Sequence, residues 1–584
     1  MNYFPLRQIT TTTRDPSFVT PFIKIMLRKR NKLMRKNKIK EADELTSKIT
    51  KQIIKNNATL LKSQTERATS KEIWTKVRSL YNTNKNIENE STLTASQLND
   101  HYTDISTDQQ YKPPLAKAGP TSNHNKFEVH DTYKALIALK KTATGPDGLP
   151  SWFLKMTALH ISGPITDMIN ESIRISKVPQ QWKSATITPI PKKKAPKVAA
   201  DYRPISITSV LSRMSERMIA KRFIIDTIKE KANCQDQYAF RPTGSTTAAI
   251  TAVIKEIVTI LENNKYARLI SLDFSKAFDQ VRHEKLFEKV SEFIVDIEVY
   301  NWLVDFFTRH KQRVRFKDEI SSETTVNSGV IQGSALGPIM FIILASDLQP
   351  LVTDNKIIKY ADDTVIIIPP SNINTTNSEM ENIGKWSAAN NLKLNTDKSK
   401  EIIFKKPRSK EEPEMIPGIA RINEINLLGV TITDKLRVDT HITNQIKKCN
   451  SNLYAMKILL SKGMETRSVE MVYNSLIISK LIYASPAWWG LTTQEEKKRI
   501  QSYLKRSARL GYCNRSIDVK KLTQKADENM FRKIIQNPEH TLRKYLTERI
   551  PQSNRATRRQ HNFQIPLVSA MNKKDFFIRM LHNL

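Results

Sequence analysis

Short runs of β-branched and other apolar residues alternate with stretches of helical spacing along the middle of the chain. Residues 267–272, 357–368 and 424–433 are rich in Ile, Leu and Val over lengths typical of strands. Residues 182–191 form a further strand candidate, which ends in prolines. Because such runs alternate with helical stretches from about residue 130 to residue 435, the pattern predicts an α+β fold.

The pattern changes to helical spacing on both sides of this region. After about residue 436, apolar residues recur three and four positions apart, at Ile442, Ile446, Cys449, Leu453, Met456 and Leu460. This stripe predicts a helix that buries one face in a core. Residues 24–40 hold many Lys and Arg and no acidic residue. They form either a solvated helix face, a nucleic-acid contact or a nuclear-import patch.

Composition narrows the class of partner. The chain has 584 residues and a formal net charge of +36, which favours nucleic acid over an acidic membrane surface. No apolar run reaches the roughly 20 residues that a membrane helix needs, and no signal peptide is visible. The patterns divide the chain into a basic helical extension and linker at 1–115, an α+β region at 116–435, a helical region at 436–520 and a basic tail at 521–584.

Two adjacent acids, Asp362 and Asp363, separate two apolar runs, which predicts a β-hairpin with both carboxylates at its tip. Alone, such a pair reads as an exposed acidic turn. Asp273, however, directly follows the strand candidate 267–272, so neighbouring strands can bring three carboxylates together. Oxygen ligands suit Mg²⁺, and two such ions serve in-line phosphoryl transfer.

Several short motifs that contain Gly, Pro, Asp or Arg occur before, between and after these acids. They are TGPDGLP (144–150), DYRPIS (201–206), AFRP (239–242), GSTT (244–247), LDFSKAFD (272–279), GVIQGSALGP (329–338), YADD (360–363), LNTDKSK (394–400) and LLGV (427–430). With them the chain resembles the reverse transcriptase of non-LTR, LINE-type retrotransposons of the jockey and chicken-repeat-like clades. The resemblance covers residues 130–435 and, more loosely, 20–515.

The resemblance implies roles for residues of the catalytic and nucleotide sites. Asp273, Asp362 and Asp363 are similar to the family's metal-binding triad, which takes two Mg²⁺ ions, with Mn²⁺ as a substitute. Phe278 stands at the family's steric gate, where a ring excludes a 2′-hydroxyl; by spacing alone it is equally a core phenylalanine. Arg203 resembles a fingers residue that holds the triphosphate.

Further residues of the same fingers and nucleotide region follow from the resemblance. Lys193 or Lys194 is similar to a second triphosphate ligand, although a solvated charge run is the alternative. Gln332 and Gly333 resemble the segment that packs on the nucleotide and template. Glycines recur at 329, 333 and 337, a spacing that on a helix clears one face for close approach of a base or backbone.

The resemblance also assigns residues near the leaving group and the primer. Lys398, with Lys400 as second choice, is similar to the lysine that protonates the departing pyrophosphate. Leu428 and Gly429 resemble the primer grip, and Tyr360 is a further candidate for contact with the primer end. Lys398 is also compatible with an ordinary surface lysine after a turn, and Tyr360 with an ordinary strand tyrosine.

As a whole, the resemblance implies a right-hand polymerase with fingers, palm and thumb, an antiparallel palm sheet, and helical N- and C-terminal extensions. The expected activity is RNA-directed DNA synthesis, with an RNA template, a DNA primer and dNTPs as partners and the nucleus and cytoplasm as locations. Trp488 and Trp489 could stack on bases, although burial in a core is favoured.

Alternatives stay open at this point. A decayed copy that binds nucleic acid without activity keeps the positive charge, and an intron-encoded reverse transcriptase shares the YADD motif. A viral RNA polymerase fits least well, because Phe278 would have to admit ribonucleotides. The usual N-terminal endonuclease has no counterpart in residues 1–115, and residues 520–584 lack the spaced acids of a ribonuclease H. We therefore expect a truncated or internally started element, without target-site nicking.

Overall fold

The chain folds into two compact units, Met1–Asn86 with Arg437–Asp527, and Ile87–Leu436 with Glu528–Leu584. The computed structural model describes residues 16, 19–65, 92–119, 126–193, 195–230, 234–294, 296–461, 463–513, 517–549 and 561–583, without the side chains of 60–65. No helix among these residues is long and apolar enough to cross a membrane. The segment boundaries expected at 115, 435 and 520 stay predictions.

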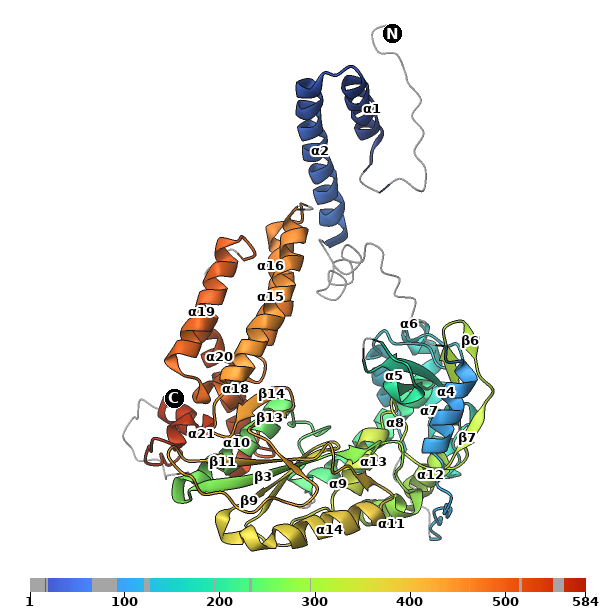
Figure 1. Ribbon diagram of the computed structural model, residues 1–584. Coiled ribbons are helices and arrows are strands. Elements are labelled where there is room, and N and C mark those ends of the chain that lie inside the picture. The colour runs from blue at the N-terminus through green and yellow to red at the C-terminus, as the bar shows by residue number, and fades with distance from the viewer. Residues whose placement is uncertain are drawn as a thin grey trace. The chain divides into compact units, whose positions relative to one another are not determined.

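The larger unit is built on a central sheet. Its strand order is β12 (Ala420–Arg421), β11 (Lys400–Lys405), β3 (Tyr266–Leu272), β9 (Asp363–Ile368) and β8 (Lys356–Tyr360), and β3, β9 and β11 run side by side in Figure 1. The pairs β11–β3, β3–β9 and β9–β8 are antiparallel, whereas β11 and β12 are parallel. The strands predicted at 267–272 and 357–368 are therefore confirmed.

Alternation along the strands buries both faces of this sheet. Ile270, Leu272, Ile366 and Ile368 belong to the main hydrophobic core, together with α11 (His283–Phe293), α12 (Ile297–Phe307) and α13 (Gly337–Leu344). The intervening residues Ser271, Ile358 and Val365 lie beside α10 (Thr246–Asn263) instead. Because helices cover both faces, the sheet holds the loops at its strand ends in fixed positions.

A second sheet lies in the same unit. Its order is β2 (Tyr202–Ile207), β1 (Ser184–Pro191), β5 (His310–Phe316) and β6 (Glu319–Ile320), and β7 (Thr324–Val326) also pairs with β5. The strand predicted at 182–191 begins later, at Ser184, because Gln180–Lys183 form a 3₁₀ turn. Helix α4 (Ala95–Ile105) packs on this sheet through a small separate core, which contains Leu98, Tyr102, Ile187, Tyr202 and Val314.

Helices and short strands complete the larger unit. The helices are α5 (Val129–Ile137), α6 (Ser151–Met156), α7 (Ala158–Arg174), α8 (Val210–Ile219), α9 (Ile225–Glu230), α14 (Thr376–Ala389) and α21 (Phe576–Asn583). Strand β4 (Phe274–Ser275) pairs with β10 (Lys393–Leu394), and β13 (Glu424–Leu427) with β14 (Val430–Thr433). The strand pair predicted at 424–433 is thus confirmed.

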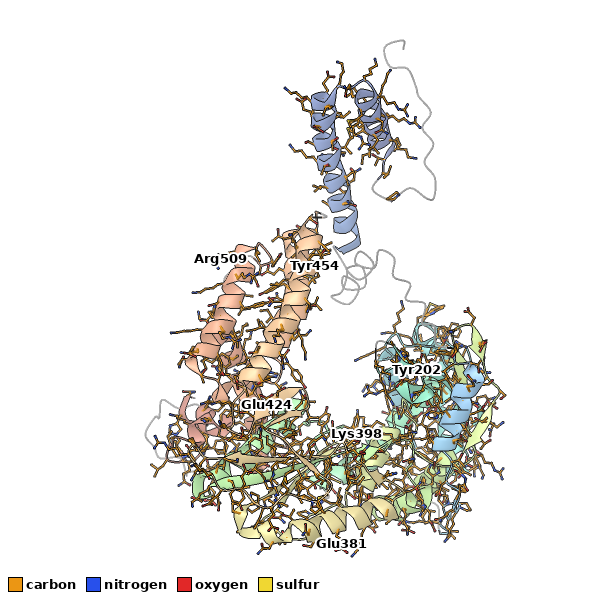
Figure 2. The ribbon with its side chains drawn as sticks, in the orientation of Figure 1. Tyr202, Glu381, Lys398, Glu424, Tyr454 and Arg509 are labelled. Carbon is orange, nitrogen blue, oxygen red and sulfur yellow. The ribbon has the colours of Figure 1, made fainter. Side chains whose placement is uncertain are left out.

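The smaller unit is helical in the residues that the structure describes. It contains α1 (Pro21–Arg35), α2 (Ile39–Thr65), α15 (Asp439–Ser461), α16 (Thr466–Tyr473), α17 (Ser479–Leu481), α18 (Ser485–Trp488) and α19 (Gln494–Arg509), and α20 (Val519–Gln536) crosses the unit boundary. The stripe on α15 is confirmed, since Ile442, Cys449, Leu453 and Met456 are buried. Tyr454, labelled in Figure 2, lies on its exposed face.

Candidate active site

Three carboxylates lie at neighbouring strand ends of the central sheet. Tyr360 pairs with Asp363, so β8 and β9 form the predicted hairpin with Asp362 in its two-residue connection. Leu272 pairs with Thr364 on the adjoining strand, and this register places Asp273 alongside Asp363. The hairpin and its neighbour therefore bring together Asp273, Asp362 and Asp363 as the sequence predicts.

The charges of these acids work against one another. Desolvation raises the pKa of Asp362, and the charge of Asp273 raises it further. Desolvation likewise raises the pKa of Asp363 to about 6, with added repulsion from Asp362 and Asp273. A bound cation would relieve this repulsion, because it stabilises the ionised form of each carboxyl.

The donor set can be tested against the expected metal. Within the described residues, no three His, Cys, Asp or Glu side chains already meet closely enough to form a metal site. Carboxylate oxygens are nevertheless the ligands that Mg²⁺ prefers, and here the three acids repel one another. The chemistry of the three acids fits hard divalent cations, and binding requires their side chains to move closer together.

A buried glutamine supports the hairpin tip. Gln237 is 1% exposed, and its Oε1 accepts hydrogen bonds from the backbone N–H groups of Ala361 and Ala239, each at 3.0 Å. Ala361 has a φ of 58°, a left-handed conformation that costs an L-residue roughly 1–2 kcal/mol. Sequence analysis missed Gln237, because nothing in the local pattern links it to a turn more than a hundred residues later.

Asp273 is fixed from the opposite side by the segment before β11. Its backbone oxygen accepts the N–H of Asn395 at 2.8 Å, and its own N–H donates to Ser399 Oγ at 3.2 Å. Lys398, labelled in Figure 2, places Nζ at 3.6 Å from Asp273 Oδ2. The structure thus brings Lys398 to the acidic site, whereas Lys400 donates to the backbone of Asp397 at 2.6 Å.

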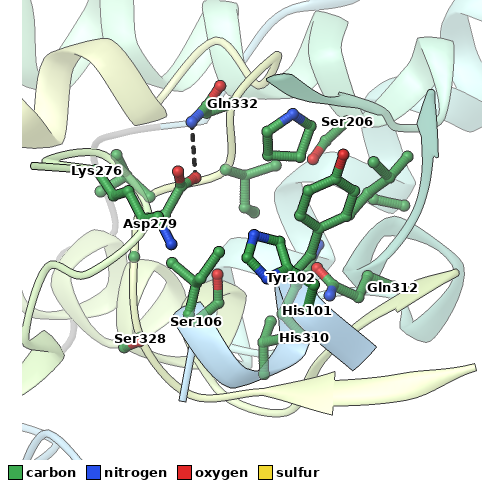
Figure 3. A pocket seen from close by; sticks show the side chains of 18 of the residues that line it. His101, Tyr102, Ser106, Ser206, Lys276, Asp279, His310, Gln312, Ser328 and Gln332 are labelled. Atoms are coloured by element: carbon green, nitrogen blue, oxygen red, sulfur yellow. Dashed lines mark hydrogen bonds between the residues drawn. The ribbon is translucent and has the colours of Figure 1, made fainter. Parts of the chain in front are cut away.

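Phe278 and Gln332 lie on two loops that contact each other. The Phe278 ring stacks on Phe341 with centroids 4.5 Å apart and stays partly exposed, so it is a half-buried residue at the edge of the core. Gln332 donates from Nε2 to Asp279 Oδ1 at 2.6 Å, as Figure 3 shows. Asp279 was not singled out from the sequence, although it follows Phe278 directly.

The helix considered for the recurring glycines is wrong. Gly329 and Gly333 lie in a loop with φ values of 84° and 125°, and only Gly337 begins a helix. A Cβ at Gly333 would meet the backbone oxygen of Ser206 at 2.2 Å, and one at Gly329 would meet that of Asp279 at 2.5 Å. The glycines therefore permit close approach, as expected, but between loops and strand backbones.

Basic side chains gather around a pocket between β1, β2 and the loops that carry Asp279 and Gln332. Lys192 and Lys276 line it together with Asp279 and Gln332. Burial lowers the pKa of Lys192, and the charges of Arg203, Lys276 and Lys398 add to this effect.

Lys192, rather than Lys193, lines this pocket, and the triphosphate role that the resemblance implies for Lys193 or Lys194 stays a prediction. Lys193 instead pairs with Asp201, with Nζ 2.9 Å from Oδ1. Lys194 lies outside the described residues. Arg203 is exposed on β2, as a phosphate ligand requires. Sequence analysis could not choose among adjacent lysines, because the choice depends on where β1 ends and turns.

The residues assigned to the primer also meet. Leu428 and Gly429 form the turn between β13 and β14 with φ values of 48° and 89°, and Gly429 donates its N–H to Asn426 Oδ1 at 3.1 Å. Leu428, Tyr360 and Asp363 line one pocket beside α10.

In the smaller unit, Trp488 and Trp489 are buried, and Trp488 Nε1 donates to the Tyr483 carbonyl at 2.7 Å, so the favoured core interpretation is confirmed.

Comparison with known proteins agrees with this geometry. Residues 190–432 match the family model described as "Reverse transcriptase (RNA-dependent DNA polymerase)". A probable RNA-directed DNA polymerase from transposon X-element of Drosophila melanogaster is 29% identical over 59% of this chain and 39% of its own length. The corresponding enzyme from transposon BS is 26% identical over 73% and 49%, and that from mobile element jockey 26% over 63% and 42%.

The chain spans between 39% and 49% of the length of these relatives. Among solved structures, apo telomerase from Candida tropicalis aligns with 76% of this chain and 89% of its own, at a TM-score of 0.35 and 12% identity. The family match and the antiparallel central sheet together place the larger unit in the α+β, right-hand polymerase class. The expected loss of an endonuclease segment stays a prediction.

Proposed function

We propose that the protein is an RNA-directed DNA polymerase of a non-LTR retrotransposon, because residues 190–432 match the reverse transcriptase family model. It would extend a DNA 3′ end on an RNA template by nucleotidyl transfer from dNTPs. The observation that carries this proposal is Asp273 beside the Asp362–Asp363 hairpin tip, with basic side chains on the adjoining loops. Acids without nearby cations would bind metal but would not hold a triphosphate.

Asp273, Asp362 and Asp363 would hold two Mg²⁺ ions, for which Mn²⁺ can substitute. When bound, the ions activate the attacking 3′-hydroxyl and neutralise the leaving pyrophosphate. Lys398 would donate the proton that the pyrophosphate takes up, since its ammonium already lies 3.6 Å from Asp273. The three carboxyl groups would bind the ions in their deprotonated form, which the bound cations stabilise against the desolvation and repulsion that raise the pKa of Asp362 and Asp363.

The residues around the acids would position the two substrates. Arg203 would hold the triphosphate, because its planar guanidinium binds phosphate through two parallel hydrogen bonds. Lys192, which lines the pocket, is better placed than the ion-paired Lys193 to assist it. Phe278, whose side chain is half-buried, would exclude a 2′-hydroxyl with its ring.

The turn at Leu428 and Gly429, with Tyr360 beside it, would set the primer end against Asp363. The RNA template, the DNA primer and the dNTPs are therefore the proposed partners, and the net charge of +36 supports binding to both nucleic acids. A polymerase that copies RNA into chromosomal DNA has to reach the nucleus as well as the cytoplasm, and the basic segment 24–40 is compatible with import.

Primer extension tests the proposal. The purified 584-residue chain is incubated with Mg²⁺, four dNTPs and a DNA primer annealed to an RNA template. Wild type should extend the primer, and Asp362→Asn should abolish extension because it removes a metal ligand without changing shape. The matched control is Asp354→Asn, an exposed acid on the turn before β8, which should extend as wild type does.

Binding of the same primer–template, measured on the same preparation, separates an enzyme from an inactive copy. Asp362→Asn should bind the duplex as wild type does, because the basic surface is unchanged. Wild type that binds without extending would contradict polymerase activity and would favour a nucleic-acid-binding remnant. Extension that persists in Asp362→Asn would contradict the assignment of the site.

A further inference from the structure

We infer that a buried pocket of the larger unit binds a small, neutral, single-ring heterocycle that carries hydrogen-bond donors and acceptors. The pocket lies between α4, the second sheet and the loop before α13, and Figure 3 shows part of its lining. The acids Asp273, Asp362 and Asp363 of the candidate active site do not line it. The inference therefore goes beyond the proposed function, and its test needs no polymerase activity.

Five buried polar side chains line this pocket, and each has at least one polar atom without a hydrogen-bond partner. All five are at most 5% exposed. The unpaired atoms are the hydroxyls of Tyr102, Tyr202 and Ser328, both ring nitrogens of His310, and Nδ1 of His283. Because buried polar groups in folded proteins are nearly always paired, six such atoms around one cavity indicate a ligand that pairs with them.

The fold holds these side chains in place from separate elements. Tyr102 on α4 and Tyr202 on β2 belong to the small core of the second sheet. The His283 ring packs edge-on against Phe307 at 5.4 Å, and its Nε2 lies 2.8 Å from the Gly329 carbonyl oxygen. Since a carbonyl only accepts, Nε2 carries the proton and Nδ1 is left as an acceptor. The polar groups are therefore positioned before a ligand binds.

The two histidines of the pocket are uncharged at neutral pH. Burial lowers the pKa of His310 to about 3 and that of His283 to about 4. Among the charged residues of the lining, Lys192 and Lys276 are exposed at its mouth, and Asp279 already accepts a hydrogen bond. A neutral ligand enters such a site without the desolvation cost that a charged ligand bears.

The size and the walls of the pocket favour one flat ring. Ile105, Ile187, Phe307 and Val326 supply apolar walls between the polar groups. The cavity measures about 70 Å³. One water needs roughly 10–15 Å³ by the same measure, so the space suits about five to seven water-sized groups, as in a six-membered ring. A ring covers apolar walls with its faces and turns its polar edge to the hydroxyls, as ligands in mixed pockets do.

The polar groups also indicate the chemistry of the ring edge. Neutral His310 presents one donor and one acceptor, the hydroxyls can do either, and Nδ1 of His283 accepts. An edge on which an N–H adjoins a C=O satisfies such a mixture. Ring amides of the pyrimidinone kind have this edge and are neutral at pH 7, so uracil is a suitable probe.

Binding is measured by ligand-observed NMR titration of the 584-residue chain with uracil and three related molecules. Uracil should bind at one site. Toluene has a similar size without polar atoms, orotate adds a carboxylate, and uridine adds a ribose that exceeds the space for one ring. Each of the three should bind at least tenfold more weakly than uracil, because a polar site rejects analogues that leave its buried groups unpaired.

Two substitutions remove unpaired hydroxyls without filling the pocket. Ser328→Ala and Tyr102→Phe should each weaken uracil binding about fivefold, the value of one ordinary hydrogen bond. Neither should lower the urea midpoint of the free protein, because the hydroxyls are unpaired there. Tyr300→Phe is the matched control outside the pocket. Its hydroxyl donates to the Leu115 carbonyl at 3.3 Å, so this variant should lose stability and keep its affinity for uracil.

Four results would overturn the inference. They are no uracil binding by wild type, an unchanged uracil affinity in both pocket variants, uridine or toluene binding as tightly as uracil, and displacement of uracil by dTTP with Mg²⁺ in Ser328→Ala and wild type alike. A stability loss in Ser328→Ala and Tyr102→Phe without loss of uracil affinity would assign the hydroxyls to an internal water network. None of these results depends on primer extension, so the proposed function is decided separately.

Discussion

Replacement of Gln237 by methionine removes the support under the hairpin that carries Asp362 and Asp363. Methionine has a similar length and fills the same buried space, but it cannot accept the N–H groups of Ala361 and Ala239, which now lie 3.0 Å from Oε1. A buried donor left unpaired costs about 1–3 kcal/mol. Loss of both bonds therefore predicts a destabilisation of about 2–6 kcal/mol. We expect a value in the lower half of this range, because the turn can relax so that the freed N–H groups reach water.

Relaxation of the turn should also disturb the metal site. Ala361 has a φ of 58°, and the hydrogen bond to Gln237 helps to offset the strain of that conformation. Without the bond, Ala361 can return to a commoner conformation and shift the two carboxylates that follow. We expect the Mg²⁺ concentration for half-maximal primer extension to rise about tenfold in Gln237→Met. Misplaced ligands should lose about 1.4 kcal/mol of Mg²⁺ binding free energy, which is close to the value of one hydrogen bond and corresponds to a tenfold change in affinity.

Urea unfolding and a Mg²⁺ titration of primer extension measure the two effects separately. Gln501→Met is the matched control, because it removes a side-chain amide of the smaller unit that donates to the Ile517 carbonyl at 2.8 Å and accepts the N–H of Val519 at 2.9 Å. It should lower stability without a change in the Mg²⁺ requirement. The reasoning is refuted if Gln237→Met unfolds within about 0.5 kcal/mol of wild type and needs the same Mg²⁺ concentration.

Three further substitutions test other parts of the site. Phe278→Ala should raise ribonucleotide incorporation relative to dNTPs at least tenfold in single-nucleotide assays, and an unchanged ratio would show that the ring does not contact the sugar. Gly333→Ala places a Cβ 2.2 Å from the Ser206 oxygen at a φ of 125° and should lower the free energy of unfolding by about 2 kcal/mol or more in urea titrations. Burial lowers the pKa of His283 to about 4, so the unfolded state gains a proton first, and between pH 7 and pH 5 the wild type should lose about 2 kcal/mol more stability than His283→Gln in the same assay.

The strands and the acidic hairpin could be predicted because their signals are local. Apolar β-branched runs end at Asp273 and flank the pair at 362–363, and the structure places a strand or turn at each position. The turn at Leu428 and Gly429 is likewise encoded by two strand-forming runs on either side of a glycine. Such features need no information from distant segments.

The supporting contacts could not be predicted, because they join segments far apart in sequence. Gln237 meets Ala361, and Asp279 meets Gln332, only after the sheets have formed. The helix considered for the glycines at 329–337 was wrong for the same reason, since the spacing is set by oxygens of other segments that approach Gly329 and Gly333. The assignment of Lys193 over Lys192 depended on the path of a loop, which residue type does not determine.

Two kinds of unfavourable interaction are concentrated at the acidic site, and they predict opposite effects of substitution on stability. Desolvation, together with repulsion from Asp362 and Asp273, raises the pKa of Asp363 to about 6, so stability is lost as the pH rises from the ordinary carboxyl range through about 6, and Asp363→Asn should increase stability at pH 7.5 while it removes activity. Gln237 offsets backbone strain at Ala361, so removal of the Gln237 amide should lower both stability and activity. Urea unfolding of the two variants at pH 7.5 without metal therefore separates residues that carry the chemistry from residues that hold them. A stability loss in Asp363→Asn would show that the hairpin acids are satisfied by partners within the fold rather than reserved for a cation.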